Sequence, residues 1–256
     1  MNDRMILTPY FLDEYDPVIA ALAGDDWHVV APDLPDGDQP TRLSAIHRAL
    51  AGEVRAALAA GERPVSIAGD CCATLGVLAG LQGAGQEPAL IWLDAHGDFN
   101  TADTTPSGFL GGMPLAMAVG LGDQTLVEGA GLRAWPESKV ILSDARDLDP
   151  GERDNVARSA IRHVPDLETL LQPGALPDGP LYVHFDADVI DPSDAPAMTY
   201  AAPGGPASET VRDVLRSLNA TNRLAAISVT LWTPELDPDG ETRVVVQGAI
   251  NALLGR

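Results

Sequence analysis

Two short apolar segments of the sequence each end in charged side chains at alternate positions. The first, residues 91–100, reads IWLDAHGDFN, and the second, residues 182–188, reads YVHFDAD. Side chains at positions i, i+2 and i+4 of a β-strand project from the same face. Each segment therefore directs carboxylate and imidazole groups to one point beyond the end of a buried strand. Carboxylates held so close together are costly unless cations neutralise them, so the pattern predicts a metal site.

The chemistry of these side chains indicates the kind of metal. Carboxylate and imidazole donors suit a hard or borderline divalent ion such as Mn²⁺ better than a metal that prefers thiolates. The number of carboxylates favours a pair of ions, and the sequence is therefore interpreted as that of a binuclear metal hydrolase. The candidate ligands from the two segments are Asp94, His96, Asp98, Asp186 and Asp188.

Short apolar runs alternate with amphipathic stretches along the rest of the chain. The expected strands are 5–8, 28–30, 65–68, 89–93, 139–142, 161–164, 181–185 and 224–229, and the expected helices are 41–60, 72–81, 114–119, 152–159, 208–218 and 242–254. Apolar strands that alternate with helices are typical of a mainly parallel sheet covered on both faces. We expect a single α/β domain over residues 1–256, with its ligands beyond the carboxyl ends of the strands.

Charge and composition exclude several classes of partner. The net charge of −21 argues against nucleic-acid binding, because no basic patch accompanies it. No apolar stretch approaches the roughly 18–20 residues of a membrane span, and residues 1–16 contain no apolar segment of a signal peptide. Cys71 and Cys72 are adjacent, so a disulfide between them would be strained. The sequence predicts a cytoplasmic protein with a small-molecule substrate.

A third segment completes an ordered set of motifs. Residues 65–72 read VSIAGDCC, a strand that turns into a helix, and they precede the segments at 94–100 and 184–192. In order and spacing the three resemble the arginase (ureohydrolase) family, which includes agmatinase and formiminoglutamase. The landmarks that also match are 106–108, 146–152 and 203–205. The resemblance implies a three-layer α/β/α fold with a mainly parallel sheet of about eight strands, and a homo-oligomer, either a trimer or a hexamer.

The resemblance also implies which residues bind two Mn²⁺ ions in each chain. Asp94 and Asp186 bridge the ions. His96 and Asp188 complete one site, and Asp98 serves the other. A hydroxide that bridges the two ions attacks the trigonal carbon of a guanidine, formimino or amide group, and Asp98 passes a proton to the leaving amine. The expected reaction is cleavage of a non-peptide C–N bond in a small amino-acid-derived substrate.

The remaining family ligand is a His in a Gly-Asp-His segment, and this chain has Cys71 in its place. Thiolate is soft and Mn²⁺ is hard, so the replacement weakens or re-tunes one metal position. Cys at this position occurs in branches of the family that hydrolyse N-hydroxyarginine, so it does not by itself indicate an inactive site. Cys71 is either a metal ligand or a small buried residue beside the metal.

Substrate-binding positions match the family only in part. Asn100, Ser107 and Asp149 match positions that hold the amino-acid end of the substrate. Gly111 stands where arginases have a His proton shuttle, and Leu231 stands where the family has a Glu that pairs with the guanidinium. Losing a buried carboxylate partner weakens the binding of a cation, which disfavours a plain arginase.

His184 shares the strand face of Asp186 and leaves alternatives open. It is either a proton shuttle or a hydrogen-bond partner of a metal ligand, or it is an ordinary core histidine. One alternative function is the hydrolysis of a neutral amide, formyl or formimino substrate with His184 as proton shuttle. Another is a catalytically silent family member that acts as a structural or regulatory partner, although five of the six metal positions are kept.

Two further predictions concern the loops beside the metal site. Arg146 and Asp147 are expected to form a structural ion pair. Asp191 is expected to fix the loop below the metals by accepting hydrogen bonds from backbone amides.

Overall fold

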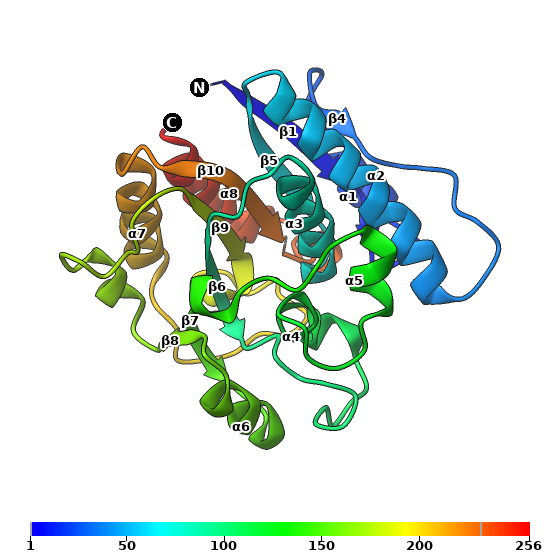
Figure 1. The fold of residues 1–256 in the computed structure, drawn as a ribbon. Helices are drawn as coiled ribbons and strands as arrows, with labels where there is room; N and C mark the ends of the chain where they lie inside the picture. The colour runs from blue at the N-terminus through cyan, green and yellow to red at the C-terminus, as the bar shows by residue number, and fades with distance from the viewer. Residues whose placement is uncertain (1, 231) are drawn as a thin grey trace.

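The computed structural model describes residues 2–230 and 232–256 and contains a central eight-stranded sheet (Figure 1). Every pair of neighbouring strands in it is parallel. The strand order is β4-β1-β5-β10-β9-β6-β7-β8. The strands are β1 (Asp3–Thr8), β4 (His28–Val29), β5 (Arg63–Ala68), β6 (Ala89–His96), β7 (Val140–Asp147), β8 (Arg162–Val164), β9 (Leu181–Asp186) and β10 (Leu224–Thr230). The predicted parallel sheet of about eight strands is confirmed.

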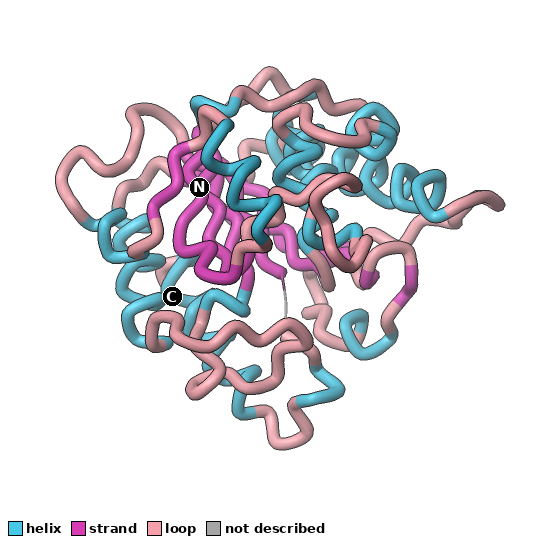
Figure 2. Tube along the Cα trace, turned by 90° about the horizontal axis from the view of Figure 1, so that it is seen from below, coloured by secondary structure: helices cyan, strands magenta, loops and turns pink. Residues whose placement is uncertain are grey.

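Helices cover both faces of the sheet, and Figure 2 shows the strands between two groups of helices. The helices are α1 (Pro17–Ala20), α2 (Gln39–Ala59), α3 (Thr74–Gly83), α4 (Pro114–Ala118), α5 (Thr125–Ala130), α6 (Pro150–Arg158), α7 (Ser208–Ala220) and α8 (Glu241–Leu254). The 3₁₀ helices are η1 (Cys71–Ala73), η2 (Leu110–Gly112), η3 (Glu137–Lys139), η4 (Leu167–Leu171), η5 (Ala187–Val189) and η6 (Pro234–Leu236). None of the helices in the described residues is long and apolar enough to cross a membrane.

The side chains of β6 show why this strand lies in the middle of the protein. Leu90 and Trp92 belong to the apolar cluster beneath α2, α3 and α5, whereas Ile91 and Leu93 belong to the cluster beneath α7 and α8. A strand that is apolar on both faces needs a helical layer on each side. The two apolar clusters are thus the two interfaces of a three-layer α/β/α fold.

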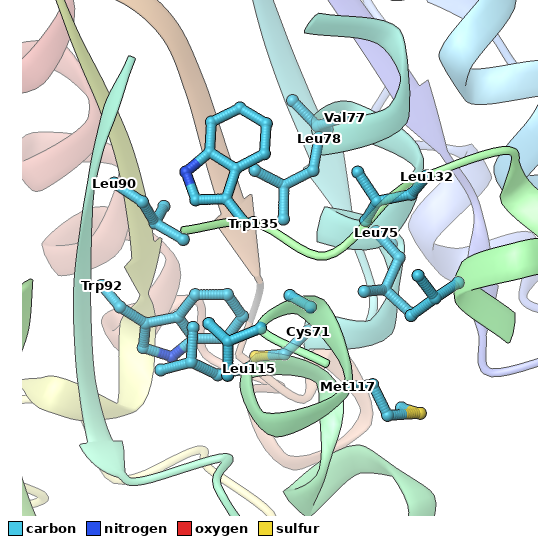
Figure 3. Close-up of a cluster of buried hydrophobic side chains, with 14 of the residues drawn as sticks. Cys71, Leu75, Val77, Leu78, Leu90, Trp92, Leu115, Met117, Leu132 and Trp135 are labelled. Carbon is cyan, nitrogen blue, oxygen red and sulfur yellow. The ribbon is translucent and has the colours of Figure 1, made fainter. Parts of the chain in front are cut away.

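The first apolar cluster extends to Cys71, one of the predicted metal ligands. Figure 3 shows Cys71 at the edge of this cluster, near Trp92 and Leu115. Helices α2 and α3 approach closely at Gly80, where an added Cβ would lie 2.5 Å from Cβ of Val54. The close contact is possible because glycine has no side chain. The position of α3, which directly follows η1, is therefore fixed by core packing.

Besides 3₁₀ helices, two short helices and one hairpin in the described residues were not among the predicted elements. They are the short helices α1 and α5, and a hairpin of β2 (Tyr10–Phe11) and β3 (Glu14–Tyr15). Each is six residues or fewer, too short for a clear hydrophobic period. The hairpin matters for function because it carries Phe11 to the rim of the cavity described below.

Candidate metal centre

A cavity of about 780 Å³ opens at the carboxyl ends of the central strands. The six predicted metal ligands all line it, as do Asn100, Ser107 and Asp149. The ligands come from three places: the start of η1 after β5, the end of β6 with the loop that follows, and the end of β9 with η5. They are Cys71, Asp94, His96, Asp98, Asp186 and Asp188.

Two groups of side chains in the described residues have donor atoms close enough to hold a metal ion. In each group the donor atoms lie within 4.8 Å of one another. The first group is Cys71, Asp94, His184 and Asp186, and the second is Asp94, His96 and Asp188. Asp94 belongs to both, as a bridging ligand must. Asp98 lines the cavity but stands outside both groups.

Hydrogen bonds orient the two carboxylates expected to bridge the ions. Asp94 accepts from the indole Nε1 of Trp92 at 3.0 Å and from the backbone amide of His96 at 2.7 Å. Asp186 accepts from Thr230 Oγ1 at 2.5 Å. Burial, followed by the charges of neighbouring carboxylates, raises the pKa of Asp186 well above its usual range. A carboxylate such as Asp186, which is oriented but costly to ionise alone, fits the binding of a cation.

Cys71 lies among these carboxylates. Its Sγ is 3.0 Å from Asp186 Oδ2, 3.4 Å from Thr230 Oγ1 and 3.9 Å from Asp94 Oδ2. Burial and then the neighbouring carboxylates raise the pKa of the Cys71 thiol. Only a bound cation would make the thiolate favourable here.

Asp98 adopts an unusual backbone conformation for a residue that is not glycine. Its φ is +49°, and its carbonyl accepts from the amides of Leu115 and Ala116 at the start of α4. The side-chain Oδ2 is buried and has no hydrogen-bond partner. Backbone strain with an unpartnered carboxylate oxygen is typical of a functional residue.

His96 and Asp188 form the outer part of the second group. His96 Nδ1 is 2.9 Å from Asp188 Oδ2 and 3.5 Å from Asp94 Oδ1. Burial alone would lower the pKa of His96, but its hydrogen bonds to Asp188 and Asp94 raise that pKa to about 12. Without a metal the imidazole is therefore charged, and it offsets part of the carboxylate repulsion.

His184 occupies a different place from a proton shuttle. Its side chain is 0% exposed and does not line the cavity. Burial lowers the pKa of His184 to about 4, so its imidazole is neutral near pH 7. A group without access to the cavity cannot exchange protons with a substrate there, so the geometry does not support the shuttle expected as one alternative.

The residues expected to bind the amino-acid end of the substrate are arranged around α6. Asn100 Nδ2 donates to Asp149 Oδ2 at 2.9 Å. Glu152 accepts from the amides of Asp149 and Phe99 at 3.1 and 2.8 Å, which ties the start of α6 to the loop after β6. Ser107 lies on an exposed loop, where its Oγ accepts from the amide of Phe109.

One wall of the cavity is aromatic, and sequence reasoning missed it. The ring centroid of Phe109 is 6.2 Å from that of Phe11 and 5.1 Å from that of Tyr200. The Phe109 ring also covers Gly111, where an added Cβ would overlap Phe109 Cε1. A side chain at Gly111 would therefore displace this ring. Leu231, the other position where a departure from the family pattern was expected, lies outside the described residues.

The loop predictions had different outcomes. Asp191 accepts from the amides of Ser193, Gly204 and Gly205, as expected. The ion pair predicted between Arg146 and Asp147 is wrong, because Arg146 pairs with Asp144. Its guanidinium also donates to the carbonyls of Asp188, Val189 and Ala202, which fastens the loop that carries Asp188.

Comparison with known proteins shows the family and the fold. The arginase family model matches residues 15–255. The N(omega)-hydroxy-L-arginine amidinohydrolase of Streptomyces lavendulae is 31% identical over 248 residues, which cover 96% of this chain and 84% of the relative. The arginase of Bacillus subtilis (strain 168) is 31% identical over 220 residues, which cover 81% of this chain and 74% of the relative. The crystal structure of the arginase from Bacillus cereus shares the fold, with a TM-score of 0.84 at 24% identity over 100% of this chain and 99% of that chain. The chain belongs to the arginase family and is a hydrolase of C–N bonds other than peptide bonds.

Proposed function

We propose that the protein hydrolyses the guanidino group of a small amino acid such as N-hydroxyarginine or arginine with two divalent metal ions, at least one of them Mn²⁺. The observation that carries this proposal is the pair of donor groups that share Asp94 at the base of the cavity. The similarity to an amidinohydrolase and to arginases, whose named substrates carry a guanidino group, supports the substrate class.

The donor atoms fit two divalent ions. The two groups supply carboxylates from Asp94, Asp186 and Asp188 and an imidazole from His96. The unpartnered Oδ2 of Asp98 adds a further oxygen donor. When bound, such a pair of ions lowers the pKa of a water molecule and stabilises negative charge on the substrate.

Asp98 is the residue we assign to proton transfer. Its Oδ2 is buried and unpartnered, and the residue lines the cavity. Burial, and then the charge of Asp94, raises the pKa of Asp98, so this carboxyl group is costly to ionise without a nearby cation. It would take a proton from the attacking water and give it to the departing amine.

Three residues at the outer part of the cavity would hold the substrate. Asp149 offers a carboxylate to an α-amino group, and Ser107 and Asn100 offer polar groups to an α-carboxylate. The Asn100–Asp149 hydrogen bond keeps these two groups at a fixed separation. A substrate whose amino-acid end is bound by these three residues would have its guanidino end at the base of the cavity.

Two alternatives have less support. A neutral amide or formyl substrate with His184 as shuttle requires access that the buried imidazole lacks. A silent structural partner would have no physical reason to keep clustered carboxylates with raised pKa values, such as Asp186 and Asp98. A trimer or hexamer and a cytoplasmic location stay predictions from the sequence.

The test is turnover of a panel of guanidino and formimino compounds, with the release of urea, hydroxyurea or ammonia as the readout. Asp98→Asn is expected to lower kcat at least about 100-fold while leaving the fold intact. Asp154→Asn, an exposed carboxylate on α6, is the control and should keep full activity. Full activity of the Asp98→Asn variant would contradict the assignment, and no turnover of any guanidino compound by the metal-loaded protein would contradict the function.

A further inference from the structure

His184 leaves one buried nitrogen without a partner. Its Nε2 is buried and makes no hydrogen bond, although the side chain is 0% exposed. A buried polar atom without a partner is costly and calls for an explanation such as an ion at that point. Of the four residues in the first donor group, His184 is the one that does not line the cavity.

The other ring nitrogen and the ring plane are held in place. His184 Nδ1 lies 3.0 Å from Thr74 Oγ1 and 2.9 Å from Ser228 Oγ. Tyr182 donates its hydroxyl proton to the same Ser228 oxygen at 2.8 Å. The indole of Trp92 packs on the imidazole with ring centroids 3.9 Å apart. A proton on Nδ1, donated to either hydroxyl, leaves the Nε2 lone pair free, which is the usual arrangement of a metal-binding histidine.

We propose that His184 Nε2 is a metal ligand and takes over the role of the nitrogen that is lost where the chain has Cys71. The imidazole then comes from β9 instead of from η1. The first site becomes a set of one sulfur, one nitrogen and two carboxylate donors from Cys71, His184, Asp94 and Asp186. The inference rests on the proposed two-metal function and refines the identity of one ion.

This donor set favours a different metal from its neighbour. A thiolate and an imidazole suit Zn²⁺, Co²⁺ or Fe²⁺ in tetrahedral geometry better than Mn²⁺. Metal–ligand bonds of about 2.0–2.3 Å put tetrahedral donors about 3.5 Å apart. The sulfur of Cys71 lies 3.0 Å from Asp186 Oδ2 and 3.9 Å from Asp94 Oδ2, which brackets that spacing. Mn²⁺ is then expected only at the site of His96 and Asp188.

The test is a titration of the chelator-treated full chain with Co²⁺, followed by absorption. One ion is expected to give a thiolate-to-cobalt band and the visible bands of a tetrahedral site. His184→Ser should weaken the binding of this ion at least about tenfold and change the visible bands. Cys71→His in the His184→Ser background should restore affinity without the thiolate band. His47→Leu, which removes another buried histidine that belongs to neither donor group, should bind Co²⁺ like the wild type.

The outcomes separate this inference from the proposed function. If the wild type binds two ions and hydrolyses its substrate while His184→Ser keeps the same cobalt spectrum and affinity, the role of His184 is refuted and the function stands. If the wild type binds no cobalt but binds Mn²⁺ and hydrolyses its substrate, this inference fails and the function stands; if it binds neither metal, both fail. X-ray absorption of the wild type with one equivalent of Zn²⁺ needs no variant: it should show one sulfur at about 2.3 Å with nitrogen and oxygen at about 2.0–2.1 Å. A coordination shell of zinc without sulfur would refute the proposed donor set of the first site.

Discussion

Trp92 donates its indole N–H to Asp94 at 3.0 Å, the carboxylate that belongs to both donor groups. Trp92 is fully buried on β6, and the next side chain on the same strand face is Asp94 itself. The strand period therefore places the donor directly beneath the carboxylate. We infer that this hydrogen bond fixes the orientation in which Asp94 can reach two ions.

Trp92→Phe is expected to weaken metal binding and to lower the free energy of unfolding by about 1–3 kcal/mol, because one oxygen of a buried carboxylate loses its donor. Metal titration and urea unfolding measure the two effects. Trp135→Phe is the control, since Trp135 is equally buried and its Nε1 has no partner to lose. Equal metal affinity in the two variants would contradict the role of Trp92.

Removal of metal is expected to lower the melting temperature. The ions bind the folded chain, whose carboxylates repel one another without them. Each ion at about 100 times its Kd therefore adds about 2.7 kcal/mol to the free energy of unfolding and about 5–10 °C to the melting temperature. Thermal melts with chelator and with added Mn²⁺ or Zn²⁺ measure the shift. Asp94→Asn removes the shared ligand and should show a smaller difference in melting temperature between chelator and metal than the wild type. A wild-type melting temperature that changes with neither chelator nor added metal would contradict the proposed metal site.

Much of the site could be predicted from the sequence because it depends on the strand period. Asp94 and His96 follow a buried apolar run, so alternation alone places both at the end of β6. Arg146 shows where that reasoning fails. The pairing of β6 with β7 shifts its register between Asp94 and His96, and Asp144 and Ala145 have φ values of +70° and +51°. Alternation alone would place Asp144 and Arg146, two positions apart, on one strand face. No sequence period encodes this irregularity, however, or shows that Asp144 and not the neighbouring Asp147 is the partner of Arg146.

The same limit applies to His184 and to the aromatic wall. Alternation predicts the strand face of His184, but whether a face meets solvent or core depends on the helix packed against it. Thr74, at the start of α3, supplies the contact that buries the imidazole. Phe109 reaches Gly111 through a local loop conformation, and such contacts have no signature in residue spacing.

Arg146→Lys is expected to destabilise the protein by about 1.5–3 kcal/mol. A lysine cannot donate at once to Asp144 and to the three carbonyls that the guanidinium holds, one of which belongs to Asp188. Urea unfolding measures the loss, and metal titration should show weaker binding as well. Arg48→Lys, which loses one exposed hydrogen bond to Gly129, should change stability by less than about 0.5 kcal/mol. Similar losses in both variants would refute the role of Arg146.

Stability is expected to fall between pH 7 and pH 5 through His47. Burial lowers the pKa of His47 to about 4, from a usual value near 6.5. At pH 5 the unfolded chain therefore binds a proton that the folded chain excludes. This contribution to stability is present above pH 6.5 and is lost as the pH falls toward 4, by about 2 kcal/mol between pH 7 and pH 5.

Urea unfolding of the wild type and of His47→Leu at both pH values isolates this contribution. The variant should lose about 2 kcal/mol less than the wild type on acidification. Ile46→Val is the control, because Ile46 is a buried residue of the same helix that does not titrate, and it should leave the pH dependence close to that of the wild type. An unchanged pH dependence in the His47→Leu variant would contradict the assignment.

The central claim is that two donor groups sharing Asp94 each hold one divalent ion. The most direct test is the metal content per folded chain, measured by mass spectrometry after purification without chelator and incubation with Mn²⁺ and Zn²⁺. The account predicts two ions per wild-type chain and fewer in the Asp94→Asn variant. A wild-type chain that retains no metal, or a variant that retains as much as the wild type, would contradict it.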